Sequence, residues 1–138
     1  MRLGEEACRH RMAAAPRAFL ATTGTDLRPH LVPVTFAIRG DELVIAIDHK
    51  PKTTTNLRRL RNIAENPQVA VLCDQYDDDW SHLWWVRADG MAKVEPISPA
   101  AVDGLAAKYP QYRGDPPGGP LIVVAVDRWS GWAHGGTS

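Results

Sequence analysis

A strand-to-helix corner collects the side chains best suited to binding an anion. Residues 47–62 read IDHKPKTTTNLRRLRN, which begins as the end of an apolar strand and finishes as a basic helix. Lys50, Lys52, Thr53 and Thr54 stand at the junction, and Arg58 lies about one turn into the helix. Backbone N–H groups at a helix start, the helix dipole, and ammonium and hydroxyl donors all favour a phosphate there. A capped helix start with solvated lysines is the alternative that the spacing leaves open.

Other kinds of chemistry find less support in the sequence. The histidines are scattered, with no pair at helical spacing, and the acidic run 77–79 has the pattern of a solvated loop. Ser81 and His82 are neighbours, yet no nucleophile elbow surrounds them and no partner orients the imidazole. We therefore predict no metal site, and we identify no catalytic side chain.

Five tryptophans in 138 residues are a second informative feature. Trp84 and Trp85 are neighbours in a predicted strand, so their side chains must point to opposite faces. One of them is available to face a cofactor ring or a subunit interface, where aromatic residues are enriched. Ordinary core packing of most of these rings is the alternative.

The composition restricts the classes of partner. Sixteen basic residues balance sixteen acidic ones, so an anion must be bound by a local cluster and not by a global field. One local basic cluster in a chain that is neutral overall argues against nucleic-acid binding. No stretch approaches the roughly 20 apolar residues of a membrane span, and no secretory signal is evident. We expect a soluble cytoplasmic protein of one domain, with Cys8 and Cys73 reduced, that binds neither nucleic acid nor membrane.

The elements that must position the basic corner are mostly short strands. Apolar and β-branched runs bounded by turn signals predict six strands, at 18–23, 30–38, 43–48, 68–74, 83–94 and 121–129. Helical spacing predicts helices at 4–15, 54–65 and 98–108, the second capped by a threonine and the third by a serine. Short strands joined by tight turns favour a mainly β fold, an antiparallel barrel with short helices. Pro33 marks an edge, a bulge, or a place where the backbone faces a ligand and not a neighbouring strand. The apolar runs in the third and sixth strands indicate burial on both faces, by the core on one side and by a partner subunit on the other.

These segments resemble a known family. The stretches AFLATTGTDLRPHLVPVTFAIRGDELVIAIDHKPKTT, NLRRLRNIAENPQVAVLCDQY and DDWSHLWWVRADGMAKV are similar to the split β-barrel flavin and deazaflavin proteins, the pyridoxamine 5′-phosphate oxidase-like group. The resemblance is closer to its actinobacterial branch of deazaflavin (F420)-dependent reductases, and it spans residues 18–132. It implies a six-stranded antiparallel split β-barrel of the FMN-binding type, with residues 1–138 as a single cofactor-binding domain.

The resemblance also implies a homodimer with two cofactor sites along the subunit interface. The phosphate is expected near the helix start, and the ring against the second and third strands. The loop at 79–80 and Trp129 of the partner subunit are expected to close the pocket. The implied cofactor-binding residues are His30, Val32, Pro33, Val34, Asp48, Lys50, Lys52, Thr53, Thr54, Arg58, Asp79, Trp80 and Trp129.

The resemblance leaves the identity of the phosphate contact open. Between Lys52 and Asn66 this chain has more residues than its relatives. The candidates for the phosphate contact are therefore Lys50, Lys52, Arg58 and Arg61.

The function that the resemblance implies is that of an oxidoreductase. Reduced F420 would pass a hydride to a small electron-poor organic acceptor, with FMN in the same fold as the alternative cofactor. The proton that follows the hydride comes from His30, His49 or solvent. A non-catalytic cofactor-binding or storage protein is the alternative from a different functional class.

Overall fold

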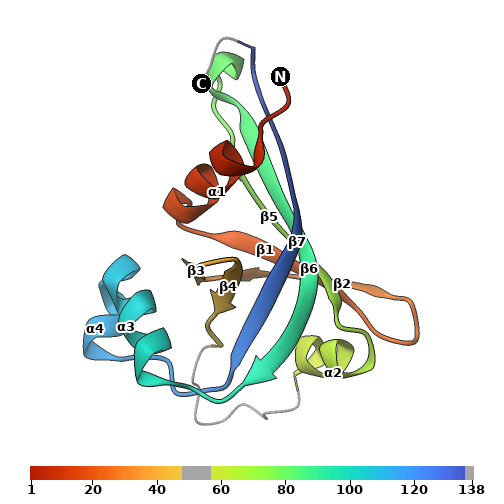
Figure 1. Cartoon of the computed structure of the whole chain (residues 1–138), viewed down its shortest axis with the longest axis vertical. Coiled ribbons are helices and arrows are strands. Elements are labelled where there is room, and N and C mark those ends of the chain that lie inside the picture. The colour runs from red at the N-terminus through yellow and green to blue at the C-terminus, as the bar shows by residue number, and fades with distance from the viewer. Residues whose placement is uncertain (48–56, 136–138) are drawn as a thin grey trace.

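The computed structural model describes residues 1–47 and 57–135 of the chain (Figure 1). The helices in these ranges are α1 (Glu5–Ala14), α2 (Arg58–Glu65), α3 (Pro99–Lys108) and α4 (Gln111–Gly114), with a 3-10 turn η1 (Trp80–His82). The strands are β1 (Ala18–Thr23), β2 (Pro29–Val34), β3 (Phe36–Arg39), β4 (Glu42–Ile45), β5 (Gln68–Gln75), β6 (Trp84–Glu95) and β7 (Leu121–Ala133).

The strands form one antiparallel sheet in the order β2-β1-β5-β6-β7-β4-β3. The strands at the two ends of this order, β2 and β3, are consecutive in the sequence, and Thr35 alone separates them. In a flat sheet, strands about 4.8 Å apart would hold these edges roughly 29 Å from each other. The two residue steps that lead from the end of β2 through Thr35 to the start of β3 span only about 7 Å. The sheet therefore curls until its edges meet at Thr35, which gives the antiparallel half-barrel with short helices that the sequence predicts.

The strand count differs from the prediction at one place. The predicted strand 30–38 bends at Thr35 and divides into β2 and β3, so that the sheet has seven strands and not six. Apolar and β-branched residues continue through the bend, so local pattern gives no sign of it. Pro33 lies on the edge strand β2, where a residue without an N–H is tolerated, as the sequence indicates.

Side chains alternate between the barrel interior and its outer face. On β6, Val86 and Ala88 are buried in the core. Trp84 packs against this core, whereas the side chain of Trp85 is 36% exposed on the outer face. The two neighbouring tryptophans therefore point to opposite faces, as predicted.

Both cysteines belong to the barrel core. Cys8 on α1 and Cys73 on β5 are buried and free, and Met12 of α1 joins them in the same cluster. Burial raises the pKa of the Cys73 thiol to about 12. A thiol that stays protonated is a poor nucleophile, so these residues act as small apolar side chains.

Helix α3 covers the outer face of β4 and β7. Its residues Ala101 and Leu105 pack against Val44, Leu121 and Val123 in a second apolar cluster. Burial of these strands on both faces is confirmed. The second face is covered by α3, however, and not by a partner subunit as the sequence analysis expected.

The three predicted helices are present, but the second begins at Arg58 and not at Thr54, and its predicted cap also needs correction. Oγ of Ser98 accepts a hydrogen bond from the N–H of Ala101 at 3.3 Å, which caps α3 as expected. Helix α2 has Leu57 as its N-cap and no side-chain cap, so the predicted threonine cap is wrong. The turns α4 and η1 were not predicted, because both are short and follow segments dense in turn-forming residues. None of the helices in the described residues is long and apolar enough to cross a membrane.

We predict that Gly90→Ala destabilises the fold by about 3 kcal/mol or more. The register of β6 and β7 shifts between Asp89 and Gly90, and a Cβ at position 90 would collide with the carbonyl oxygen of Ala125. Urea denaturation measures the effect. The control Gly104→Ala places a Cβ in open space on α3 and is expected to be neutral or stabilising. Equal stability of Gly90→Ala and wild type would contradict the assigned register.

Candidate functional site

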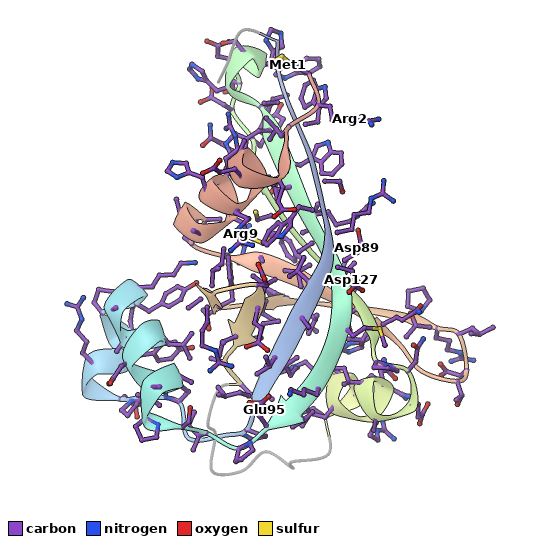
Figure 2. All side chains as sticks on the ribbon, viewed as in Figure 1. Met1, Arg2, Arg9, Asp89, Glu95 and Asp127 are labelled. Carbon is purple, nitrogen blue, oxygen red and sulfur yellow. The ribbon has the colours of Figure 1, made fainter. Side chains whose placement is uncertain are left out.

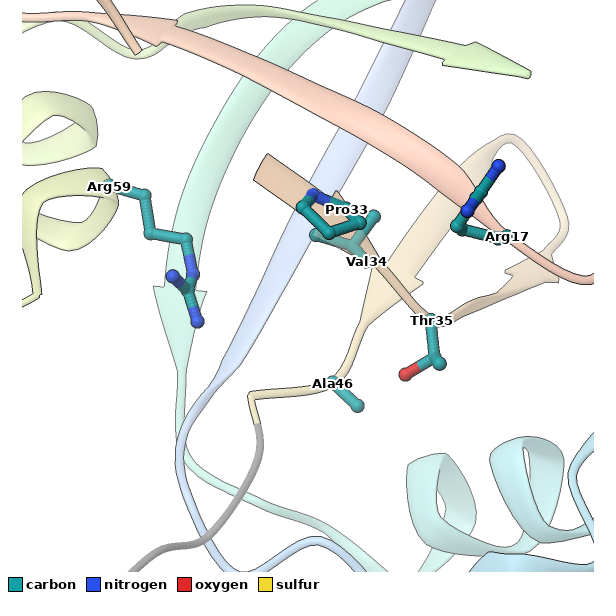
Figure 3. Close-up of a pocket in the computed structure, with 6 residues that line it drawn as sticks. All are labelled: Arg17, Pro33, Val34, Thr35, Ala46 and Arg59. Carbon is teal, nitrogen blue, oxygen red and sulfur yellow. The ribbon is translucent and has the colours of Figure 1, made fainter. Parts of the chain in front are cut away.

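The two edges of the sheet meet beside a cavity of about 270 Å³ (Figure 3). Figure 3 shows Arg59 and Thr35 on opposite sides of the opening, with the Thr35 hydroxyl turned toward the side of Ala46. A guanidinium, a hydroxyl and small apolar side chains together suit a compact anionic group. The lining residues are Arg17, Pro33, Val34, Thr35, Ala46 and Arg59.

Hydrogen bonds hold the corner at Thr35 in place. Its carbonyl accepts from the N–H of Ala46 at 3.2 Å, which joins the segment after β4 to the corner. Its Oγ1 lies 2.7 Å from the phenolic oxygen of Tyr112. The N–H of the following residue, Phe36, donates to the hydroxyl of Tyr109 at 3.2 Å. The backbone at the corner therefore has defined partners although no strand runs through it.

A buried polar contact sets the rotation of α2. Nδ2 of Asn62 donates to Oγ1 of Thr22 on β1 at 3.0 Å, and both residues are 1% exposed. Arg59 precedes Asn62 by three residues and so lies on the same side of the helix. It is half-buried and lines the cavity, while Arg58 and Arg61 are exposed.

Arg59 lines the cavity, although the sequence analysis did not name it among the candidate phosphate contacts. Neither Arg58 nor Arg61 lines the cavity, and Arg58 instead lies 3.9 Å from the carboxylate of Asp26 in the β1–β2 turn. Arg59 lies between Asn62 and Ile63 on the helical wheel, but the burial of Asn62 is a property of the folded barrel, so the sequence pattern did not single out this arginine.

His30 lies on β2, opposite the buried Thr22 of β1. Its Nδ1 is buried and has no hydrogen-bond partner within the described residues. Burial lowers the pKa of His30 below its ordinary value, and the charges of Arg59 and Arg58 lower it further. The imidazole is therefore neutral at pH 7.

Arg17 adds a second cation to the cavity lining. Its guanidinium carbon lies 4.8 Å from the centroid of the Phe19 ring, and Arg17 forms no ion pair within the described part of the chain. Arg17 and Arg59 are thus a local concentration of positive charge in a chain of zero net charge.

Of the other predicted cofactor residues, some lie at the cavity or on β2 and some lie outside the described ranges. Pro33 and Val34 line the cavity, and His30 and Val32 belong to the same strand, β2. The predicted residues that lie outside the described ranges are Asp48, Lys50, Lys52, Thr53 and Thr54, together with His49.

The acidic loop forms an internally bonded turn. Oδ1 of Asp79 accepts from the N–H of Ser81 at 3.0 Å and from its hydroxyl at 2.7 Å, and these bonds lower the pKa of Asp79. The side chain of Trp80 is exposed, with its Nε1 3.4 Å from the hydroxyl of Tyr76. Neither Asp79 nor Trp80 lines the cavity of its own protomer. Across residues 1–47 and 57–135, no group of three His, Cys, Asp or Glu residues is placed to hold a metal ion.

Trp129 lies in a second cavity, of about 360 Å³, formed by β6, β7 and the N-terminal residues. The Arg9 guanidinium lies 5.6 Å from its ring centroid. Trp85 and Trp132 pair across β6 and β7 and line the same cavity, as do Arg87 and Arg128. Trp129 does not line the 270 Å³ cavity of its own protomer. Any contact of Trp129 with a cofactor there would therefore have to come from a partner subunit.

Comparisons with known proteins agree with this fold. The sequence model of the family described as pyridoxamine 5′-phosphate oxidase matches residues 5–133. No curated protein matches the sequence.

Solved structures with the same fold belong to proteins described as binding different ligands. A FAD-binding protein from Mesorhizobium loti has 18% identity over 95% of each chain, with a TM-score of 0.70. The FAD-binding protein from Mycobacterium smegmatis has 15% identity over 96% of each chain, with a TM-score of 0.63. The heme storage protein HutZ from Vibrio cholerae has 17% identity over 98% of this chain and 96% of its own, with a TM-score of 0.69.

We predict that His30 titrates below its ordinary pKa and that Arg59→Gln raises that pKa. The folded pKa is lowered, so the imidazole contributes stability that falls as the pH drops from about 6.5 toward the folded value. Two-dimensional NMR of the ring protons gives both pKa values. His10, which is exposed on α1, is the reference. A His30 pKa that does not change in Arg59→Gln would contradict the placement of this arginine.

Proposed function

Because the chain belongs to the pyridoxamine 5′-phosphate oxidase family, we propose that the cavity at the sheet edges binds the phosphate of a flavin-type cofactor and that the protein is an oxidoreductase. The cofactor we propose first is F420, and FMN is the alternative. The substrate is a small electron-poor organic acceptor. The observation that carries this proposal is the position of Arg59 and the Thr35 hydroxyl in one cavity.

The residues of the cavity fit the phosphate end of such a cofactor. Arg59 offers charge-assisted N–H donors, and Thr35 offers a hydroxyl. The volume of about 270 Å³ lies below the roughly 300–1,000 Å³ of pockets that enclose drug-sized ligands. The cavity therefore suits the phosphate, and the tricyclic ring needs further room. The edge strand β2 can supply it, because one side of its backbone has no strand partner in the described residues.

The chain's own residues would bind and orient the cofactor. A bound deazaflavin or flavin supplies the hydride chemistry. Pro33 and Val34 give an apolar wall beside the phosphate-binding groups. His30 on the same strand is neutral at pH 7, which suits a hydrogen-bond acceptor and not a general acid, so we propose that the proton that follows the hydride comes from solvent.

We also propose that a second copy of the chain covers the outer face of the sheet. Leu72 on β5 and Trp85 and Trp132 on β6 and β7 are 39%, 36% and 37% exposed. Arg87 and Asp89 lie on the same face of β6, 3.0 Å apart as an ion pair. An apolar patch with charged groups beside it is the usual composition of a protein interface. We propose further that in such a dimer Trp129 of the partner subunit closes the cofactor pocket.

A second candidate function is cofactor binding without turnover. Within the described residues, no carboxylate, cysteine or histidine side chain lines the cavity. The similar structure of HutZ belongs to a heme storage protein, so this fold serves storage as well. Binding without reduction of any acceptor would favour this candidate.

We predict that F420 or FMN quenches the tryptophan fluorescence on binding and that Arg59→Met weakens binding by roughly 10- to 100-fold. The expected loss of affinity corresponds to the net free energy of one hydrogen bond to a charged group, about 1.5–3 kcal/mol. The matched control is Arg61→Met, which removes an exposed arginine of the same helix.

Equal losses in the two variants would contradict the assignment of Arg59, and failure of F420, FMN and FAD to bind the wild type would contradict the proposed function. Reduced cofactor with a panel of quinones and unsaturated carbonyl compounds then separates the oxidoreductase from the storage protein.

We predict a dimer in sedimentation equilibrium and its loss in Leu72→Glu. A buried unpaired carboxylate costs several kcal/mol, so the dimer dissociation constant should rise at least roughly 100-fold. The control is Ile97→Glu, in which the altered residue is 37% exposed and lies outside the strands of the sheet. A wild-type protein that stays monomeric at micromolar concentration, or an undisturbed Leu72→Glu dimer, would exclude this face as the interface.

A further inference from the structure

A groove between α1 and the end of β5 is larger than the cavity at the sheet edges. Its volume is about 550 Å³, which falls within the roughly 300–1,000 Å³ of pockets that enclose drug-sized ligands. One wall is the last turn of α1 with the residues that follow it, and the other is the end of β5, with Trp84 of β6 also in the lining. Among the described residues, this α1–β5 groove shares no lining residue with the 270 Å³ cavity.

The α1–β5 groove runs along an open strand edge. Strand β5 pairs with β6 as far as Gln75, whereas its pairing with β1 on the other side ends at Leu72 in the described residues. Successive side chains of a strand point to opposite faces, and yet Asp74, Gln75 and Tyr76 all line the groove. The groove therefore meets this segment along its edge and not on one face. A strand edge presents N–H and C=O groups that can pair with an added peptide strand.

The opposite wall is fixed to the barrel. Cys8 and Met12 of α1 are buried in the core. Arg9, labelled in Figure 2, belongs to the same helix, and its Nη1 lies 2.8 Å from a carboxylate oxygen of Asp41 in the turn between β3 and β4. On the β5 side, Nε2 of Gln75 donates to the carbonyl of His82 at 2.9 Å. Both walls are therefore held in place by contacts outside the groove.

Two opposite charges line the α1–β5 groove without neutralising each other. Arg11 on α1 and Asp74 on β5 form no ion pair, with each other or with another residue, within the described part of the chain. The guanidinium carbon of Arg11 lies 5.4 Å from the centroid of the Trp84 ring. A guanidinium that stacks on a ring uses its flat face, so the N–H donors at its rim stay available to a carboxylate. His10, which is exposed on the same wall, adds a ring nitrogen.

We propose that the α1–β5 groove binds a short peptide with free termini along the edge of β5, with the ligand carboxylate at Arg11 and the ligand ammonium at Asp74. A ligand with only a negative charge would desolvate Asp74 without giving it a partner, and a ligand with only a positive charge would do the same to Arg11. A zwitterion pairs with both groups. Its peptide unit matches the donors and acceptors of the strand edge, and Ala15, Pro16 and Trp84 supply apolar surface for a side chain.

Three matched probes test which charges the groove requires. The probes are the dipeptide L-alanyl-L-phenylalanine, its N-acetyl form without the ammonium, and its C-terminal amide without the carboxylate. Titration is followed by the amide NMR signals of Ala15 and Gln75 and by the indole signal of Trp84. We expect the dipeptide to bind at millimolar concentration or below, and each blocked form to bind roughly 5- to 10-fold more weakly, because each loses one charge-assisted contact in a partly exposed site.

Two variants assign the charges to their residues. Asp74→Asn keeps the shape of the side chain, and it should remove the difference between the dipeptide and its N-acetyl form. Arg11→Met keeps an apolar stem beside Trp84, and it should remove the difference between the dipeptide and its amide. The control is Asp103→Asn, which changes an exposed carboxylate on α3 that does not line the groove, and it should bind all three probes as the wild type does.

Equal binding of the three probes to the wild type overturns the inference. So does discrimination that persists in both variants, or a wild type whose groove signals do not respond to millimolar dipeptide. The titrations contain no flavin or deazaflavin and measure no turnover, so their outcome is independent of the function proposed for the cavity at the sheet edges.

Discussion

The closure of the sheet at Thr35 is the constraint on which the rest of the structure depends. Strands β2 and β3 occupy opposite ends of the strand order and are separated by one residue, so the sheet has to curl. The chain cannot continue as a strand there, and the groups at the bend need other partners. Ala46, Tyr109 and Tyr112 provide these partners from three parts of the fold. A cavity is left beside the bend because two strand edges meet there without pairing along their length.

The electrostatics of the cavity follow from the same closure. Helix α2 packs under the edge of the barrel, where the buried bond between Asn62 and Thr22 fixes its rotation. This rotation places Arg59 at the cavity and raises the positive potential near His30, whose pKa is lowered by burial and by the arginines. A neutral protein thereby acquires a local cationic site. An anion in the cavity would offset the repulsion, which is why such a site favours a phosphate.

The outer face of the sheet is covered by a helix in one region and exposed in another. Helix α3 buries the outer face of β4 and β7, and the tyrosines that reach the corner are Tyr109 at its C-cap and Tyr112 on α4. The outer face of β5, β6 and the end of β7 retains exposed Leu72, Trp85 and Trp132. One chain therefore completes the barrel core and lines the cavity, while the outer face of β5, β6 and the end of β7 keeps an exposed apolar surface. This asymmetry is the physical basis for expecting a subunit interface at β5–β7.

The sequence by itself determined the type of structure and supplied the pattern from which a phosphate ligand is proposed. Alternation of apolar residues predicts the antiparallel strands, Ser98 caps its helix, and the cations and hydroxyls around residues 47–62 indicate a phosphate. Only the tertiary structure decided that the predicted second strand breaks at Thr35 and that α3 covers β4 and β7. It also decided which arginine of α2 faces the cavity, since Arg59 and Arg58 are equivalent by residue type and differ only in what the barrel places against them. Local patterns encode periodicity and donor chemistry, whereas the partner of Thr35 is a tyrosine 77 residues away that no local pattern specifies.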